Sequence, residues 1–146
     1  MTRLALCLAA VLTVAACAQQ PFTTPDDKQP ARKDVVVQFG NATVLPSDAR
    51  LKAGGSVTWN NTSDYMAVVR FPKADKTKFT CRAVLRPDWQ YVADAIESIP
   101  TGGASDRIVF PCTLQPGTYP YTISLFGNIA DMDNPAFTLS ANLIVE

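Results

Sequence analysis

The chain has 146 residues, with 13 basic and 13 acidic side chains and no histidine. This charge balance excludes the strongly basic surface that nucleic-acid binding requires. The lack of histidine removes the commonest general base of enzymes, and we expect no catalytic activity. Beyond the N-terminal segment, no apolar stretch is long enough to cross a bilayer as a helix.

The first sixteen residues are typical of a secretory signal peptide. Arg3 precedes an uncharged, mainly apolar run, Leu4 to Ala16, which is too short to span a hydrocarbon core of about 30 Å as a helix. The run leads into Val14-Ala15-Ala16-Cys17, which resembles the lipobox of bacterial lipoproteins. That resemblance implies cleavage before Cys17 and attachment of lipid, including palmitate, to the new N-terminus.

The lipobox resemblance also implies a location. A lipidated Cys17 would anchor the chain in the membrane of a bacterial cell envelope. Ala18 rather than aspartate follows the cysteine, which in lipoproteins favours the outer membrane, with the domain facing the periplasm or the outside. The alternative is an ordinary secretory signal cleaved near Ala16 or Ala18, with Cys17 unmodified.

Residues 17–33 form a polar segment that contains three prolines and only one large apolar side chain, Phe22. Such a segment cannot bury enough surface to offset its ordering entropy. We therefore expect a lipidated N-terminus and flexible tether over 17–33, followed by one domain over residues 34–146.

The four cysteines can be assigned one by one. Cys7 leaves with the signal peptide and Cys17 takes the lipid, so Cys81 and Cys112 remain. Two leftover thiols in an oxidising compartment are typical of a disulfide, which would add about 3–4 kcal/mol of stability by loop closure. The alternative is a soft-metal or redox pair, although the C-x-x-C spacing typical of such pairs is absent.

From Asp34 onward, short β-type runs are separated by turn residues, a pattern typical of an all-β sandwich or open barrel. The clearest alternation covers 118–125 and predicts that Tyr119, Tyr121, Ile123 and Leu125 point inward. The other predicted strands cover 35–39, 56–60, 66–71, 107–110 and 139–145.

One segment differs from this β pattern. Asp88 is a good helix N-cap, and Pro100 would end a helix that begins there. The spacing predicts one short amphipathic helix, within an insertion covering about 72–105, that packs its apolar stripe on the sandwich. The alternative is a helix that binds a partner. The residues of the stripe are Trp89, Val92, Ala93, Ile96 and Ile99.

Two motifs resemble those of the cupredoxins. The first is Gly54-Gly55-Ser56-Val57-Thr58-Trp59-Asn60-Asn61, followed by the strand Met66 to Phe71. The second is Leu114-Gln115-Pro116-Gly117-Thr118-Tyr119-Pro120-Tyr121, with a closing strand that ends at Val145. The resemblance implies an all-β, cupredoxin-like Greek-key sandwich.

The resemblance also locates where copper ligands would stand. A type-1 copper site needs two imidazoles and a thiolate, with a weak axial ligand. The corresponding positions are Met66, Ile123 and Phe126, with the axial position at Leu139 or Met132. Because the chain has no histidine, we expect no blue-copper site, no other metal site and no cofactor; these residues would then form an apolar plug at one end of the domain.

We therefore expect a non-catalytic binding or assembly module of the cell envelope, which contacts an unidentified envelope protein. Either the apolar residues at the copper end simply pack the core, or some of them form an exposed partner surface. The alternative function is binding or delivery of Cu(I) by methionine and cysteine sulfurs. The candidate partner surface consists of Tyr65, Met66, Phe126, Met132 and Phe137.

Overall fold

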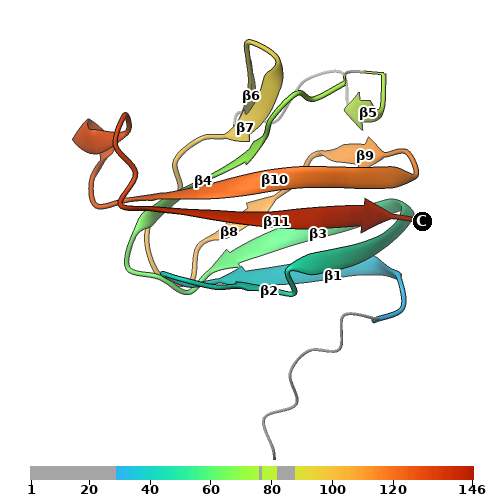
Figure 1. Cartoon of the computed structure of the whole chain (residues 1–146), viewed down its shortest axis with the longest axis horizontal. Coiled ribbons are helices and arrows are strands. Elements are labelled where there is room, and N and C mark those ends of the chain that lie inside the picture. The colour runs from blue at the N-terminus through green and yellow to red at the C-terminus, as the bar shows by residue number, and fades with distance from the viewer. Residues whose placement is uncertain (1–28, 76, 82–87) are drawn as a thin grey trace, which may run out of the picture.

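The computed structural model describes residues 29–75, 77–81 and 88–146 (Figure 1). The predicted signal peptide, Cys17 and most of the predicted tether lie outside these residues. Within the part that is described, no helix has both the length and the apolar character needed to cross a membrane.

The described chain contains β-strands and almost no helix. Its single helical element is a short 3-10 turn, η1 (Ile129–Asp131). The strands are β1 (Arg32–Phe39), β2 (Val44–Leu45), β3 (Asp48–Asn61), β4 (Met66–Phe71), β5 (Phe79–Cys81), β6 (Trp89–Val92), β7 (Ala95–Ser98), β8 (Arg107–Val109), β9 (Cys112–Leu114), β10 (Gly117–Phe126) and β11 (Phe137–Val145).

The strands form two layers that share β3. The hydrogen-bonded order is β2-β1-β3-β11-β10-β4-β7-β6, and β8 also pairs with β3. The first part of β3 pairs with β11, between Asp48 and Leu51, whereas its last part pairs with β1 and β8. One layer is therefore β2-β1-β3-β8 and the other is β11-β10-β4-β7-β6, with β5 and β9 as a separate small sheet. This arrangement is a β-sandwich.

The change of layer along β3 depends on two glycines, at the bend seen on the right in Figure 1. Gly54 has a φ of 75°, which is a left-handed conformation that glycine adopts without strain. Gly55 is packed against the backbone, since a Cβ there would lie 2.2 Å from the carbonyl oxygen of Lys33 and 2.8 Å from that of Lys52. These contacts explain why the first motif opens with two glycines.

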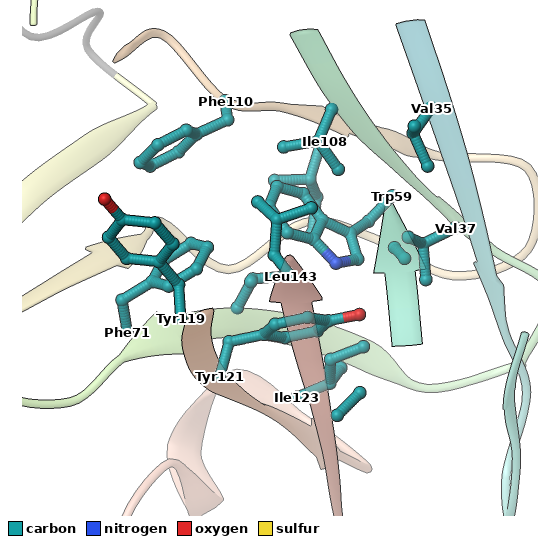
Figure 2. Packing of buried hydrophobic residues seen from close by; sticks show 14 of the residues in the cluster. Val35, Val37, Trp59, Phe71, Ile108, Phe110, Tyr119, Tyr121, Ile123 and Leu143 are labelled. Carbon is teal, nitrogen blue, oxygen red and sulfur yellow. The ribbon is translucent and has the colours of Figure 1, made fainter. Parts of the chain in front are cut away.

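The core between the two layers is aromatic. Trp59 is fully buried and contacts the rings of Phe71, Trp89, Phe110 and Tyr121, with centroids 5.4–6.2 Å apart. Figure 2 shows this ring packed among side chains from both layers. Because these side chains come from strands far apart in sequence, their mutual burial holds the layers together.

The six predicted strands are all present, with longer bounds than predicted for β3. The alternation of β10 is also confirmed, because Tyr119, Tyr121, Ile123 and Leu125 are all buried. The side of β10 at Pro120 lacks a strand partner among the described residues, since pairing with β4 starts only at Thr122. The domain begins slightly earlier than predicted, because β1 starts at Arg32, inside the expected tether.

The predicted helix after Asp88 is wrong. The segment forms the β6–β7 hairpin, with a two-residue turn at Ala93 and Asp94, where Ala93 has a φ of 53°. Short apolar runs fit helical and strand spacing equally well, and the β-branched and aromatic residues here favour strands. The hairpin is also stabilised by its pairing with β4, in which Phe71 lies opposite Ile96.

The predicted disulfide is confirmed. Cys81 and Cys112 are bonded and occupy directly opposite positions of the antiparallel pair β5–β9. Their sulfurs are therefore not thiolates, so in the oxidised protein this pair cannot bind a soft metal ion as the alternative hypothesis proposed.

Candidate functional site

Two loops meet at one end of the sandwich, which we call the loop end. Residues 62–65 connect β3 to β4, and residues 127–136 connect β10 to β11. Because Phe126 at the end of β10 pairs with Met66 at the start of β4, both loops leave the sheets at the same place. The loop end is at the left of Figure 1, opposite the bend of β3.

The loop end is organised by Asn61, the last residue of β3, which is fully buried. Its Oδ1 accepts hydrogen bonds from the backbone N–H (2.9 Å) and the hydroxyl (2.7 Å) of Ser63. Its Nδ2 donates to the carbonyl oxygens of Tyr65 (2.8 Å) and Gly102 (3.2 Å). The amide thus fixes the position of Tyr65 and ties the 62–65 loop to residues 99–106, the segment between β7 and β8.

Asn61 belongs to the first cupredoxin-like motif, which by itself predicts no role for its side chain. The signal in the sequence is an asparagine directly after the predicted strand 56–60 and two residues after Trp59. A buried amide needs several hydrogen-bond partners, and loop carbonyls are the nearest source of them. We regard Asn61 as a positioning residue for the loop end.

The positions that correspond to the copper ligands of cupredoxins do not converge on one centre. Ile123 lies opposite Leu139 across β10–β11, on the inward face of the sheet. Phe126 lies opposite Met66, and because Phe126 directly follows the inward-facing Leu125, this second pair lies on the other face. The sequence predicted that these residues form one apolar cluster at the end of the domain. In the structure they form two cross-strand pairs on opposite faces of one layer.

The candidate partner surface is brought together only in part. The rings of Tyr65 and Phe137 meet edge to face, with centroids 5.4 Å apart, and Phe137 is 40% exposed. Met66 and Met132 are half-buried. Phe126, which lies opposite Met66, is only 4% exposed and is therefore too deeply buried to contact a partner directly.

Ile129 is the apolar side chain at the loop end that the sequence analysis missed. It is 70% exposed, in η1, the most exposed of the large apolar side chains in the described residues. The turn that presents it is fixed by Asn128, whose Oδ1 accepts from the N–H of Ala130 (2.6 Å) and whose Nδ2 donates to Asp131 (2.7 Å). The signal was a β-branched apolar residue between Asn128 and Asp131 in a loop.

The charges around this surface are acidic. Asp64 directly precedes Tyr65, and Asp131 and Asp133 flank Met132; all three carboxylates are exposed. The two loops, 62–65 and 127–136, contain no lysine or arginine. The loop end therefore combines exposed apolar side chains with negative charge.

The described residues contain no group of three or more histidine, cysteine, aspartate or glutamate side chains placed to share one metal ion. Among the sulfur groups proposed for Cu(I), the two cysteines are joined in the disulfide. The thioethers of Met66 and Met132 are the sulfur groups that the chain places at the loop end.

Comparison with known proteins gives likenesses of structure only. No family model matches the chain, and no curated protein sequence matches it. Seven chains of solved structure match. An oxidised mutant of amicyanin has 16% identity over 82% of this chain and 89% of its own length, with a TM-score of 0.49.

Two auracyanins show similar values. The sodium-dithionite-reduced auracyanin of the photosynthetic bacterium Roseiflexus castenholzii has 17% identity over 80% of this chain and 99% of its own, with a TM-score of 0.42. Auracyanin B has 15% identity over 81% of this chain and 91% of its own, with a TM-score of 0.43. All three proteins are cupredoxins.

Proposed function

We propose that this chain is a lipid-anchored, cupredoxin-like module without a blue-copper site, which binds a partner protein of the bacterial cell envelope through its loop end. The observation that carries the proposal is the pairing of Met66 with Phe126 and of Ile123 with Leu139 on opposite faces of one layer. Because these two apolar pairs lie on opposite faces and carry no nitrogen donor, they can pack against neighbouring side chains but cannot coordinate one metal ion together.

The direction of the chain supports presentation of the loop end away from a membrane. β1 runs parallel to β3, and its last residue, Phe39, lies opposite Asn61 at the loop end. The first residue, Arg32, is therefore at the other end of the strand, next to the predicted tether. A lipid on Cys17 would hold that end toward the bilayer and leave Tyr65, Ile129 and Phe137 facing outward.

The chemistry of the loop end indicates what kind of surface would fit it. Exposed apolar and aromatic side chains contribute most to protein interfaces, and charges at the rim add attraction at long range. Because the flanking charges are Asp64, Asp131 and Asp133, the partner surface should be apolar at its centre and basic around it.

Site-specific crosslinking in the native cell tests the binding proposal. A photoreactive benzoylphenylalanine in place of Phe137 should yield one adduct of defined mass, whereas the same group at Val36, exposed on the outer face of β1, should not. The adduct should weaken at higher salt and with Asp131→Asn/Asp133→Asn, because both remove charge attraction. Equal labelling from positions 137 and 36, or no adduct from 137, would contradict the proposal.

Metal analysis of the full chain purified from its native membrane tests the other half of the proposal. We expect no stoichiometric copper and no blue colour. A single bound Cu(I) that is lost in Met66→Leu/Met132→Leu would replace the proposal with the copper-delivery function. Cys17 is tested by labelling with a fatty-acid analogue, which should be incorporated into the unmodified chain but not into Cys17→Ser.

A further inference from the structure

A separate hollow lies at the other end of the sandwich, between the end of β4, the start of β10 and β5. Its volume is about 360 Å³, within the range of small-molecule sites in proteins. It is lined by Phe71, the last residue of β4, and by Thr118, near the start of β10. The loop end lies at the opposite ends of these two strands, so the two sites share no residue. We call it the β4–β10 pocket.

The floor of the β4–β10 pocket is aromatic and already in place. Phe71, Phe79 and Tyr119 line it, and each is at most 6% exposed. Phe79 meets Phe71 and Tyr119 edge to face, with centroids 5.9 Å and 5.3 Å apart. The hydroxyl of Tyr119 donates to the carbonyl oxygen of Gln115 (2.7 Å), which fixes the orientation of that ring. A ligand would therefore meet a rigid apolar surface.

One wall of the pocket is a strand edge without a partner strand in the described part of the chain. β10 pairs with β4 only from Thr122 onward. The residues before it, Thr118, Tyr119 and Pro120, therefore face the hollow on the side where a neighbouring strand would otherwise lie. Pro120 has no amide hydrogen, which lowers the cost of leaving this edge unpaired. Pro72 and Ala74 complete the apolar walls.

The rim of the pocket has an excess of positive charge. Lys73 and Lys78 both line it and are exposed, and neither takes part in an ion pair closer than 4.0 Å within the described residues. The carboxylate of Asp75 accepts hydrogen bonds from the hydroxyl (2.6 Å) and the N–H (3.0 Å) of Thr77. These bonds hold the pKa of Asp75 below its ordinary value, so it stays ionised and engaged with its own loop.

We infer that the β4–β10 pocket binds a small amphipathic carboxylate, with its apolar body on the rings of Phe71, Phe79 and Tyr119 and its anionic group toward Lys73 and Lys78. Lys73 and Lys78 together with Asp75 give the rim a net charge of one positive unit, which favours a ligand with a single negative charge. The aromatic floor selects a flat or branched apolar body. This site is independent of the loop end, and its failure would leave the proposed function untouched.

Phenylacetate is a suitable probe, with phenylacetamide as its neutral counterpart and acetate as the anion without a ring. In NMR titrations of the full chain, phenylacetate should shift the amide signals of Phe79 and Tyr119, with a dissociation constant of about a millimolar, as expected for a fragment of this size. Phenylacetamide and acetate should bind at least about fivefold more weakly, since each lacks one of the two contacts.

The double variant Lys73→Gln/Lys78→Gln should weaken phenylacetate binding roughly fivefold and leave phenylacetamide unchanged. Lys52→Gln is the matched control, because Lys52 is an exposed lysine outside the pocket, and it should change neither. Equal affinity for phenylacetate and phenylacetamide would overturn the carboxylate assignment. An absence of shifts at Phe79 and Tyr119 at saturating probe would overturn the site.

Discussion

The indole of Trp59 and the ring of Tyr121 meet edge to face in the middle of the sandwich, with centroids 5.4 Å apart and an interplanar angle of 74°. Trp59 Nε1 and Tyr121 Oη are both buried, and neither has a hydrogen-bond partner in the described part of the chain. Figure 2 shows the two polar atoms on the same side of the cluster, toward Val37 and Ile123. By geometry the hydroxyl of Tyr121 makes no hydrogen bond to any described residue, although the Trp59 indole beside it offsets part of its desolvation.

This relationship predicts that Tyr121→Phe is tolerated at neutral pH. The substitution keeps the ring contact with Trp59 and removes a buried hydroxyl whose desolvation is offset only in part, by the Trp59 indole. We expect the free energy of unfolding to stay the same or to rise by about 1 kcal/mol, measured by chemical denaturation. A loss of more than about 2 kcal/mol would show that the hydroxyl is in fact bonded.

The same group predicts the stability of the protein in alkali. Burial raises the pKa of Tyr121 to about 12; the nearby Trp59 indole offsets part of the effect, and Asp48 adds to it. The phenol of the unfolded chain ionises near pH 10, so the unfolded state loses its proton first as the pH rises. Stability from this group is full below about pH 10 and falls by about 3 kcal/mol as the pH approaches 12.

Denaturation at pH 9, 10, 11 and 12 checks this alkaline prediction. The difference in unfolding free energy between Tyr121→Phe and the unmodified chain should grow in favour of the variant above about pH 10. Tyr119, whose pKa burial also raises, is present in both proteins and so cancels in the comparison. Parallel pH profiles for the two proteins would contradict the assignment.

The bend of β3 predicts a large effect for a small substitution. Gly55→Ala places a Cβ 2.2 Å from the carbonyl oxygen of Lys33, so the backbone must shift next to the β1–β3 pair Asp34–Ser56. We expect a loss of more than about 3 kcal/mol in the free energy of unfolding. Gly127→Ala is the matched control, because no atom lies within 4 Å of its Cβ position, and it should change stability by less than about 0.5 kcal/mol.

The disulfide predicts a stability difference between oxidised and reduced protein. Cys81 and Cys112 are 31 positions apart, and the bond removes loop-closure entropy from the unfolded chain. Cys81→Ala/Cys112→Ala should therefore lose about 3–4 kcal/mol of unfolding free energy. The unmodified chain in excess reductant should approach the same denaturation midpoint. Identical midpoints with and without reductant would contradict this prediction.

Two phenylalanines at the loop end should separate folding from binding. Phe126→Ala removes a ring that is 4% exposed and should cost about 3–5 kcal/mol of stability. Phe137→Ala removes a ring that is 40% exposed and should cost about 1 kcal/mol, mainly the contact with Tyr65. Partner crosslinking from a probe at Ile129 should fall in Phe137→Ala, although that protein remains folded. An unchanged adduct would remove Phe137 from the partner surface.

Local sequence pattern was sufficient for six of the eleven strands in the described residues, β1, β3, β4, β8, β10 and β11, and for the inward face of β10. In 118–125 the apolar and polar residues alternate, and alternation is a property of each residue's immediate neighbours, so Tyr119 to Leu125 could be oriented without knowing the fold. The pairing of Cys81 with Cys112 followed from counting, because the other two cysteines had been assigned elsewhere.

Other features depend on which strands become neighbours. The segment after Asp88 has apolar spacing that fits a helix or a hairpin, and the edge of β4, supplied by distant residues, selects the hairpin. Likewise, the sequence left open whether Phe126 packs the core or forms part of an exposed surface, and the folded protein leaves it only 4% exposed, opposite Met66 across β10–β4. Residue order states which side chains are present and how they alternate, whereas burial and hydrogen bonding across strands are long-range contacts that exist only once the layers have packed.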